Sequence, residues 1–362
     1  MNTDLIRNIQ LPCRIRLAVL LLMVVSWSFI SAQTVGDTFN EEGFDCKVVS
    51  IEEGKLAAII TGGTVPENGN LMIPATIEHE GQVFAVDAIG DKAFGGMDII
   101  TLDLSAATSL ASIGASAFAE CTKLQTVIFP KAETSKLKEI GHLAFHHAYA
   151  LQSMNLEDTH LEVLESFFSK DEDDEISIPG LKEIKLPETL REIKKYALQF
   201  LDIKEIEIPS GVTSFADCVL EGCIYLEKFT WKNAQITNLP RHTFLGVCDV
   251  LEEVTLLTVE PLKSDGLTDR HFYMCDKDLL HVYVTPESLA SLAEGGYTNE
   301  TAIFSTLVAY EGTPDDPMAI ASPRKVLPAS GDDAYYTLQG IRVQHPQPGQ
   351  LYIQNGHKVI FR

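Results

Sequence analysis

Short alternations of apolar and polar residues recur along most of the chain. Eight segments place two apolar residues two positions apart: Leu102/Leu104, Val127/Phe129, Met154/Leu156, Ile184/Leu186, Ile206/Ile208, Phe229/Trp231, Val254/Leu256 and Val282/Val284. A period of two is typical of a short β-strand that buries one of its faces. Pro130, Pro187 and Pro209 directly follow three of these pairs and are expected to end those strands, because proline has no backbone N–H to donate. The pattern predicts eight short strands.

A second pattern precedes the predicted strands. The segments AIGDKAF, SIGASAF and EIGHLAF begin at Ala88, Ser112 and Glu139, and more degenerate copies occupy 192–198, 214–220, 238–244 and 266–272. We call the first apolar residue of each copy its anchor residue: Ile89, Ile113, Ile140, Leu164, Ile193, Phe215, Leu239 and Leu267. Five positions after seven of the anchors lies what we call the stacking residue: Phe94, Phe118, Phe145, Leu198, Leu220, Phe244 or Phe272, and in the Leu164 copy Phe168 lies one position earlier.

These spacings favour a solenoid. The anchor residues lie 22 to 29 residues apart, and a unit of that size cannot close a hydrophobic core by itself. Its inward-facing side chains must therefore stack on the equivalent side chains of neighbouring copies. We expect a mainly β protein with short irregular or helical turns, built as a solenoid of about eight rungs.

Copies of the form I-G-x-x-A-F-x-x-C-x-x-L-x-x-V-x-F-P, as in Ile113–Pro130, resemble the BspA-type leucine-rich repeat of bacterial surface proteins, which is common in Bacteroidetes. The resemblance extends from Leu71 to Tyr310 and implies a leucine-rich-repeat solenoid that serves in adhesion and protein binding. The copies that depart most from the pattern are the fourth, which 169–177 interrupt, and those after Phe215, which lack the Ile-Gly pair.

The segments on either side of the repeats predict a cap and a closing segment. Residues 33–81 are expected to form an N-terminal β cap and an opening strand, with cap strands at Phe44–Val49 and Leu56–Ile60. Such a cap would shield the strand edges of the first rung. The solenoid is expected to occupy 82–310. It would finish, as in the family that it resembles, with a helix at Pro286–Ala293 and a last strand near Leu307–Tyr310.

The C-terminal residues predict a linker and a second, smaller unit. Residues 311–328 are rich in Pro, Asp and Ala and have no periodicity, which is typical of a linker. Residues 329–362 predict a small β module with strand-bearing segments at Tyr335–Val343 and Gly349–Ile353 and a hairpin at Asn355-Gly356. This module resembles a short C-terminal segment of many exported Bacteroidetes proteins, which in some of them is related to type IX sorting domains. The resemblance implies delivery to the cell surface.

Residues 1–32 have the pattern of a signal peptide. Arg7, Arg14 and Arg16 precede an apolar run from Leu17 to Ile30, and small residues follow it. The run has 14 residues, fewer than the roughly 20 that cross a bilayer core. We therefore expect cleavage near Gln33, no membrane insertion of the mature chain, and a secreted or cell-surface protein, with the exterior of an outer membrane as one destination.

Composition and charge exclude several classes of partner. The chain is 45% hydrophobic and 22% charged, which is typical of a folded protein. Its 51 acidic residues outnumber 28 basic ones, for a net charge of −23. Residues 1–32 contain three arginines and one aspartate, so the remainder carries −25. Such a charge repels phosphate backbones and anionic lipids, and we expect neither nucleic acid nor a membrane surface as partner.

Catalytic and metal-binding motifs are incomplete. His79-Glu80 begins like a zinc-protease helix, but Val83 stands where the second histidine is needed. His146 and His147 follow Phe145 on an expected loop with no acidic or cysteine neighbour beside them. No phosphate-binding loop or nucleophile elbow occurs, so we expect no enzyme, no catalytic residue, no metal site and no cofactor. Calcium binding by the acidic run 171–175 stays open, although the run lacks the glycine of a tight calcium loop.

Four cysteines occupy one position of the repeat. Cys121, Cys223, Cys248 and Cys275 follow the stacking residue by three or four positions. In such a position a cysteine packs as a small hydrophobic residue. A disulfide between neighbouring rungs is the alternative, because exported proteins can form one.

The outward-facing residues of the predicted strands are the candidate binding site. Aligned rungs would place these residues in two adjacent columns, which we call the ribbon, and solenoids bind partners through such extended surfaces. The candidate residues of the ribbon are Asp103, Thr126, Ile128, Asn155, Glu183, Lys185, Glu205, Glu207, Lys228, Thr230, Glu253, Thr255, His281 and Tyr283.

We expect an exported, surface-displayed binding protein without enzymatic activity, whose partner is an extracellular or host protein. The alternative is a glycan-binding surface component. Glycan platforms use exposed aromatic rings that stack on sugars. After residue 32 the chain has one tryptophan, Trp231, which is expected to face inward, and Tyr283 is the one aromatic residue of the ribbon.

Overall fold

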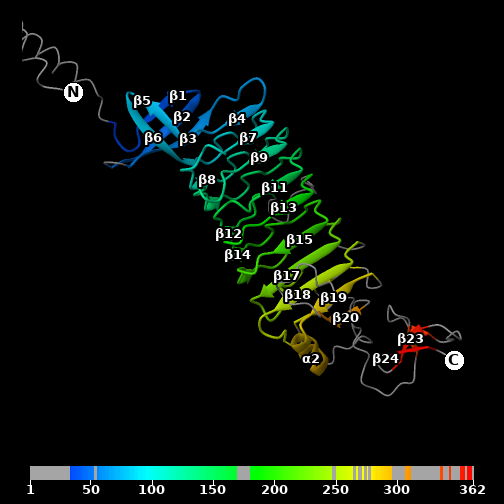
Figure 1. Ribbon diagram of the computed structural model, residues 1–362. Helices are drawn as coiled ribbons and strands as arrows, with labels where there is room; N and C mark the ends of the chain where they lie inside the picture. The colour runs from blue at the N-terminus through cyan, green and yellow to red at the C-terminus, as the bar shows by residue number, and fades with distance from the viewer. Residues whose placement is uncertain are drawn as a thin grey trace, which may run out of the picture.

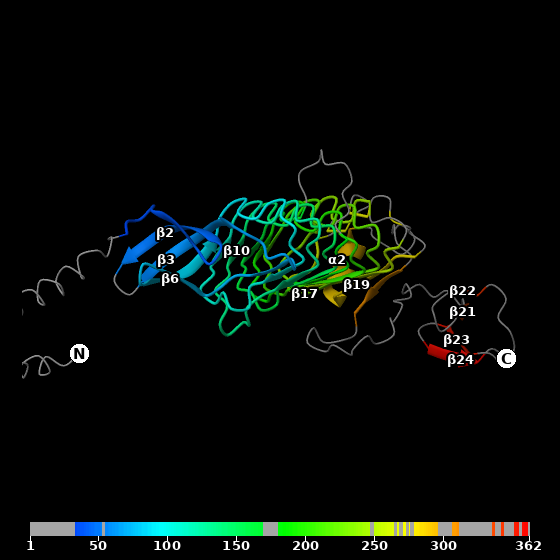
Figure 2. The same cartoon turned by 90° about the horizontal axis from the view of Figure 1, so that it is seen from above.

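The computed structural model describes residues 33–52, 55–168, 180–246, 250–263, 266–267, 271–272, 275, 279–295 and 306–310, together with the backbone of four short strands between 335 and 360. The described residues form an elongated stack of rungs that runs from an N-terminal cap to helix α2 (Pro286–Glu294) (Figure 1). Successive rungs lie side by side as coils (Figure 2). The expected signal peptide, the linker, the acidic run 171–175 and Cys248 lie outside the described residues.

One side of each rung is a strand, and we call these strands together the strand ladder. Their parallel pairings fall into three successive sheets of three, two and five strands. All eight predicted strands are present and lie between β4 and β20. The ladder consists of β4 (Asn70–Met72), β7 (Thr101–Asp103), β9 (Thr126–Ile128), β11 (Ser153–Asn155), β13 (Glu183–Lys185), β15 (Glu205–Ile208), β17 (Lys228–Ala234), β18 (Glu253–Thr258), β19 (His281–Val284) and β20 (Thr306–Ala309). The predicted solenoid is thereby confirmed.

A second, shorter ladder carries six of the eight anchor residues, and its parallel pairings fall into two successive sheets. It consists of β6 (Gln82–Ile89), β8 (Ser112–Ile113), β10 (Glu139–Ile140), β12 (Val163–Leu164), β14 (Glu192–Ile193) and β16 (Ser214–Phe215). Ile89, Ile113 and Ile140 are at most 2% exposed, and the anchors of the later copies are buried as well. The residues predicted to face inward therefore form the core.

The stacking residues fill the space between the two ladders. Phe118 lies between Phe94 and Phe145, with both ring-centroid distances at 5.6 Å and interplanar angles of 4° and 12°. Phe244 and Phe272 repeat this arrangement at 5.3 Å. The rings within these two groups stack nearly parallel, and the rungs share one continuous hydrophobic core.

Six turns between the ladders repeat one backbone conformation. We call the position two residues after the stacking residue the left-handed position, because its φ is positive in all six turns. The residues there are Gly96 (73°), Glu120 (63°), His147 (61°), Phe200 (58°), Gly222 (71°) and Gly246 (74°). Hydrogen bonds join consecutive turns, such as Gly96 N to Ala119 O (2.8 Å) and Glu120 N to His146 O (2.7 Å). Residues at equivalent positions of neighbouring turns therefore lie next to each other.

The N-terminal cap continues the short ladder. Strands β1 (Thr38–Glu41), β2 (Phe44–Glu52) and β3 (Lys55–Gly63) pair antiparallel, and β3 then pairs in parallel with β6. This confirms both predicted cap strands. Strand β5 (Thr76–His79) pairs antiparallel with β6, and the expected boundary between residues 81 and 82 falls at this hairpin.

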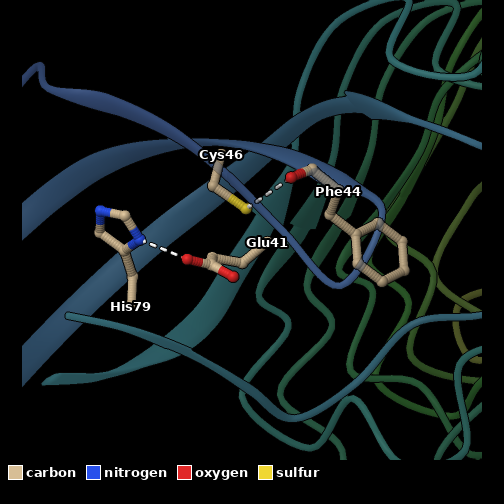
Figure 3. Close-up of polar contacts among 4 residues, drawn as sticks. All are labelled: Glu41, Phe44, Cys46 and His79. Atoms are coloured by element: carbon tan, nitrogen blue, oxygen red, sulfur yellow. Dashed lines mark hydrogen bonds and ion pairs between the residues drawn. The ribbon is translucent and has the colours of Figure 1, made fainter. Parts of the chain in front are cut away.

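One polar contact joins the first cap strand to β5, and another lies within β2. The Nδ1 atom of His79 lies 2.8 Å from Oε1 of Glu41, and the Cys46 thiol donates to the Phe44 carbonyl at 3.9 Å (Figure 3). The His79 ring also stacks on Phe39 at a centroid distance of 4.3 Å. The buried side chains of the cap continue the core of the rungs, since Phe44 lies edge-on to Phe94 at a centroid distance of 6.5 Å.

Helix α2 and strand β20 close the other end, as predicted. Thr285 caps the helix, because its hydroxyl oxygen accepts a hydrogen bond from the Ser288 N–H at 3.2 Å. The buried Ser288 hydroxyl accepts from the Leu262 N–H at 3.0 Å, and Leu292 is fully buried. The helix is thus fixed to the last rungs by both polar and apolar contacts.

The C-terminal strands agree with the predicted β module. They are β21 (Tyr335–Tyr336), β22 (Arg342–Val343), β23 (Leu351–Gln354) and β24 (His357–Ile360), and all pairings among them are antiparallel. Gln354 pairs with His357, which agrees with the expected hairpin between β23 and β24.

The repeated cysteines are buried thiols. The five cysteines within the described residues are free. The thiols of Cys121 and Cys223 donate to the carbonyls of Phe94 and Leu198, at 3.2 and 3.0 Å, which are stacking residues of the preceding rungs. Burial raises the pKa of Cys121 to about 11 and that of Cys223 to about 12. The expectation of small, buried packing residues is confirmed for these two.

Replacement of Phe118 by alanine tests the shared core. The variant should lower the free energy of unfolding by about 3–5 kcal/mol, because it leaves a cavity between two stacked rings. Thr126→Ala, at an exposed position of β9, should cost less than about 0.5 kcal/mol. Urea unfolding followed by circular dichroism measures both. Equal losses would contradict the register described above.

Replacement of Cys223 by alanine tests the buried thiol. A group whose pKa is raised by folding keeps its proton in the folded state while the unfolded chain loses it, so alkaline pH destabilises the folded protein. Between about pH 9 and about pH 11, each such thiol should lower the free energy of unfolding by about 1.4 kcal/mol per pH unit. Urea unfolding across this range should give a steeper decline for the unmodified chain than for Cys223→Ala; parallel slopes would show that the thiol is not buried.

Candidate interaction surface

The strand ladder places the ribbon residues in register. Glu205, Lys228, Glu253 and His281 occupy equivalent positions on β15, β17, β18 and β19. The second column follows the same strands two residues further on, from Glu207 through Thr230 and Thr255 to Tyr283. Parallel in-register pairing therefore brings together side chains that are far apart in the sequence.

The ribbon residues of the first rungs have a different character. Asp103 pairs with Ile128, which is 41% exposed, and Thr126 is exposed beside them. The Asp103 carboxylate accepts a hydrogen bond from the Ser105 N–H at 2.9 Å, and the Asn155 side chain accepts from the Glu157 N–H at 2.9 Å. Asp103 and Asn155 therefore hold the turns that follow their strands.

One ribbon residue is largely buried. Thr255 is 5% exposed, although its register places it on the outer face between Thr230 and Tyr283. The larger side chain of Tyr283 shares that face, and the Thr255 hydroxyl donates to Glu253 at 3.4 Å. Thr255 therefore offers little surface to a partner, although it is among the residues that line the hollow of the later rungs.

The later rungs form a hollow of about 720 Å³ on the outer face of the strand ladder. Its charged lining residues comprise six glutamates and three lysines: Glu157, Glu183, Glu188, Glu205, Glu207, Glu253, Lys185, Lys228 and Lys232. Among them, Glu157, Glu188 and Lys232 were not part of the predicted ribbon. Glu157 and Lys232 continue the alternation of their strands by one outward position, and that pattern would have identified them.

Each lysine of the hollow faces a carboxylate. Lys228 Nζ lies 2.9 Å from Glu253 Oε1, and Lys232 Nζ lies 3.7 Å from Glu207 Oε1. Lys185 lies 3.9 Å from carboxylates of both Glu157 and Glu183. Exposed ion pairs of this kind contribute at most about 1 kcal/mol each. Because carboxylates outnumber ammonium groups by three, the hollow has a net negative charge and attracts cations.

Two tyrosines line the hollow near its last strand. Tyr283 lies on β19, and Tyr310 follows β20. Burial, and next the charge of Glu253, raise the pKa of the Tyr283 phenol. The phenol therefore keeps its proton and can donate a hydrogen bond at neutral pH.

Two expectations about other sites can be compared with the structure. Within the described residues, Glu120, His146 and His147 form a group of three side chains with metal-ligating atoms. The expectation that these histidines have no acidic neighbour is therefore wrong, because Glu120 comes from the preceding rung.

Trp231 is fully buried, as predicted. None of the helices among the described residues is long and apolar enough to cross a membrane.

Two solved structures of bacterial leucine-rich repeat proteins are similar to this chain. A search of curated protein sequences finds no match. A leucine-rich repeat protein from Bacteroides ovatus is 19% identical, over 68% of this chain and 55% of its own, with a TM-score of 0.38. A leucine-rich cell surface protein from Faecalibacterium prausnitzii is 16% identical, over 69% of this chain and 73% of its own, with a TM-score of 0.41. The chain thus spans about half the length of the B. ovatus protein.

The family model of the BspA type leucine-rich repeat region, with six copies, matches residues 87–180 and 176–302. These two ranges include most of the strand ladder and the short ladder, and together they cover more than half of the chain. The chain belongs to the BspA-type leucine-rich repeat family.

Proposed function

We propose that this chain is an exported, non-enzymatic binding protein, displayed at a bacterial surface, that recognises a cationic segment of another protein through the hollow of its strand ladder. Membership of the BspA-type leucine-rich repeat family supports a role as a protein-binding scaffold. The signal-like residues 1–32 support export. The observation that carries the proposal is the excess of carboxylates in the hollow.

The charge of the hollow determines which partners it favours. Glu205 and Glu207 lie on the same strand, and both side chains are exposed. Carboxylates at this spacing meet alternate lysine or arginine side chains of an extended segment, because its side chains also repeat every two residues. Complementary charge accelerates the encounter and excludes anionic partners. The net charge of −23 adds to this preference.

A glycan is the second candidate partner, and the two tyrosines of the hollow favour it. Tyr283 and Tyr310 lie at one end of a surface that also presents carboxylates, and proteins use aromatic rings with polar neighbours to bind sugars. However, Tyr283 is only partly exposed, and Trp231 is buried beneath the strand ladder. A protein partner therefore agrees better with the lining of the hollow.

Charge removal in the hollow tests the proposed partner. The double variant Glu205→Gln/Glu207→Gln should bind immobilised basic extracellular matrix proteins at least about tenfold more weakly, which corresponds to about 1.4 kcal/mol. Surface plasmon resonance at two salt concentrations measures the affinity, and salt should weaken binding of the unmodified chain most. The matched control is Glu139→Gln/Glu162→Gln, which removes two exposed charges at the short ladder and should leave the affinity unchanged.

Three outcomes would contradict the proposal. The first is the absence of binding to every basic matrix protein at physiological salt, and the second is an equal loss of affinity in both double variants. The third is saturable binding on a glycan array that Tyr283→Ala abolishes while Glu205→Gln/Glu207→Gln retains it, which would favour the glycan.

Protease treatment of intact cells tests surface display, because a displayed chain is cleaved and an internal one is protected.

A further inference from the structure

A cluster of two histidines and one glutamate lies on the turns between the second and third copies of the repeat. The ligating atoms of Glu120, His146 and His147 all lie within 4.8 Å of one another. The Nδ1 atom of His147 is 2.7 Å from Oε1 of Glu120. The side chain of His147 is 24% exposed and that of Glu120 is 57% exposed, so the cluster is accessible to an ion from solution.

The repeat itself brings the three residues together. Glu120 and His147 each follow a stacking phenylalanine by two positions, and both occupy the left-handed position of their turns. The hydrogen bond from Glu120 N to His146 O fixes the two turns against each other at 2.7 Å. Glu120 thus meets both histidines although 26 or 27 residues separate them in the sequence.

Aromatic stacking keeps the two imidazoles next to each other. The rings of His146 and His147 stack at a centroid distance of 3.7 Å. The His147 ring also stacks with the Tyr149 ring, at a centroid distance of 5.1 Å. In this arrangement, with an interplanar angle of 28° between the two imidazoles, their in-plane lone pairs run almost parallel. One ring must therefore rotate about its side-chain torsions before a nitrogen of each histidine reaches the same ion. On the preceding rung the left-handed position is Gly96, where an added Cβ would meet no atom within 4 Å. This leaves space beside Glu120.

The geometry points to a transition-metal site in which Glu120, His146 and His147 bind a zinc ion, with water as the fourth ligand. Two imidazole nitrogens and a carboxylate oxygen are a ligand set that Zn²⁺ accepts in a tetrahedron with one open position. Ligand atoms of such a tetrahedron lie about 3.3 Å apart. The contact of 2.7 Å between His147 and Glu120 must therefore widen slightly, which the largely exposed glutamate side chain permits.

The ligand set also determines which ions are excluded. Calcium requires six to eight oxygen ligands, whereas this cluster offers one carboxylate beside two nitrogens. A bound zinc ion would join the second rung to the third, because Glu120 belongs to one and both histidines to the other. The folded protein should therefore become more resistant to heat when zinc is present.

Isothermal titration calorimetry of the intact, untagged protein with Zn²⁺ tests this site. The unmodified chain should bind with a stoichiometry near one. Glu120→Gln and His147→Asn should each weaken the affinity at least about tenfold, since each removes one ligand. Asparagine is chosen at position 147 because it tolerates a positive φ, so the turn should be preserved. Calcium should neither bind at the cluster nor displace zinc.

The matched control is His142→Asn, an exposed histidine of the same turn that is not part of the cluster. It should retain the affinity for zinc and the increase in melting temperature that zinc causes. Thermal unfolding of each metal-free variant checks that the fold is intact. Absence of zinc binding in the unmodified chain would overturn the inference. Equal affinities in all variants would overturn it as well, and so would an equal loss in His142→Asn. None of these outcomes bears on the protein partner, which the hollow of the strand ladder is proposed to bind.

Discussion

Each rung of this solenoid is too small to bury its own apolar side chains, and it is stable because the same side chains of the next rung cover them. Phe94, Phe118 and Phe145 show this most directly, since each ring faces the next at 5.6 Å. The buried thiol of Cys121 adds a hydrogen bond to the carbonyl of Phe94 in the preceding rung. The fold is therefore held together by contacts between neighbours, and the cap and helix α2 are needed only where a neighbour is missing.

The same stacking determines the surface. Because the core residues of successive rungs align, the outward residues between them align as well, and Glu205, Lys228 and Glu253 become adjacent without any contact specified by the local sequence. On the turns, the repeated left-handed position has the same effect for Glu120 and His147. The chemical effect of a substitution in one copy therefore depends on the residue at the same position of the next copy.

Much of this architecture could be predicted from the sequence, because the burial of the anchor and stacking residues follows the repeat spacing of 22 to 29 residues. The eight strands follow from the alternation of apolar and polar residues, whereas the closing helix was expected from the resemblance to the BspA-type repeat family. The binding surface was predicted less completely. Thr255 is largely buried, and Lys232 lies two residues beyond Thr230, outside the two predicted columns.

The sequence by itself determined the repeat, the residues that face the core and the excess of negative charge, because each of these depends on residue type and spacing alone. Only the tertiary structure decided which side chains meet across rungs. The hollow near Tyr283 and the contact between Glu120 and His147 depend on how far each copy is offset from the next. That offset follows from packing and hydrogen bonds between turns. It cannot be read from the sequence, because the copies differ in length.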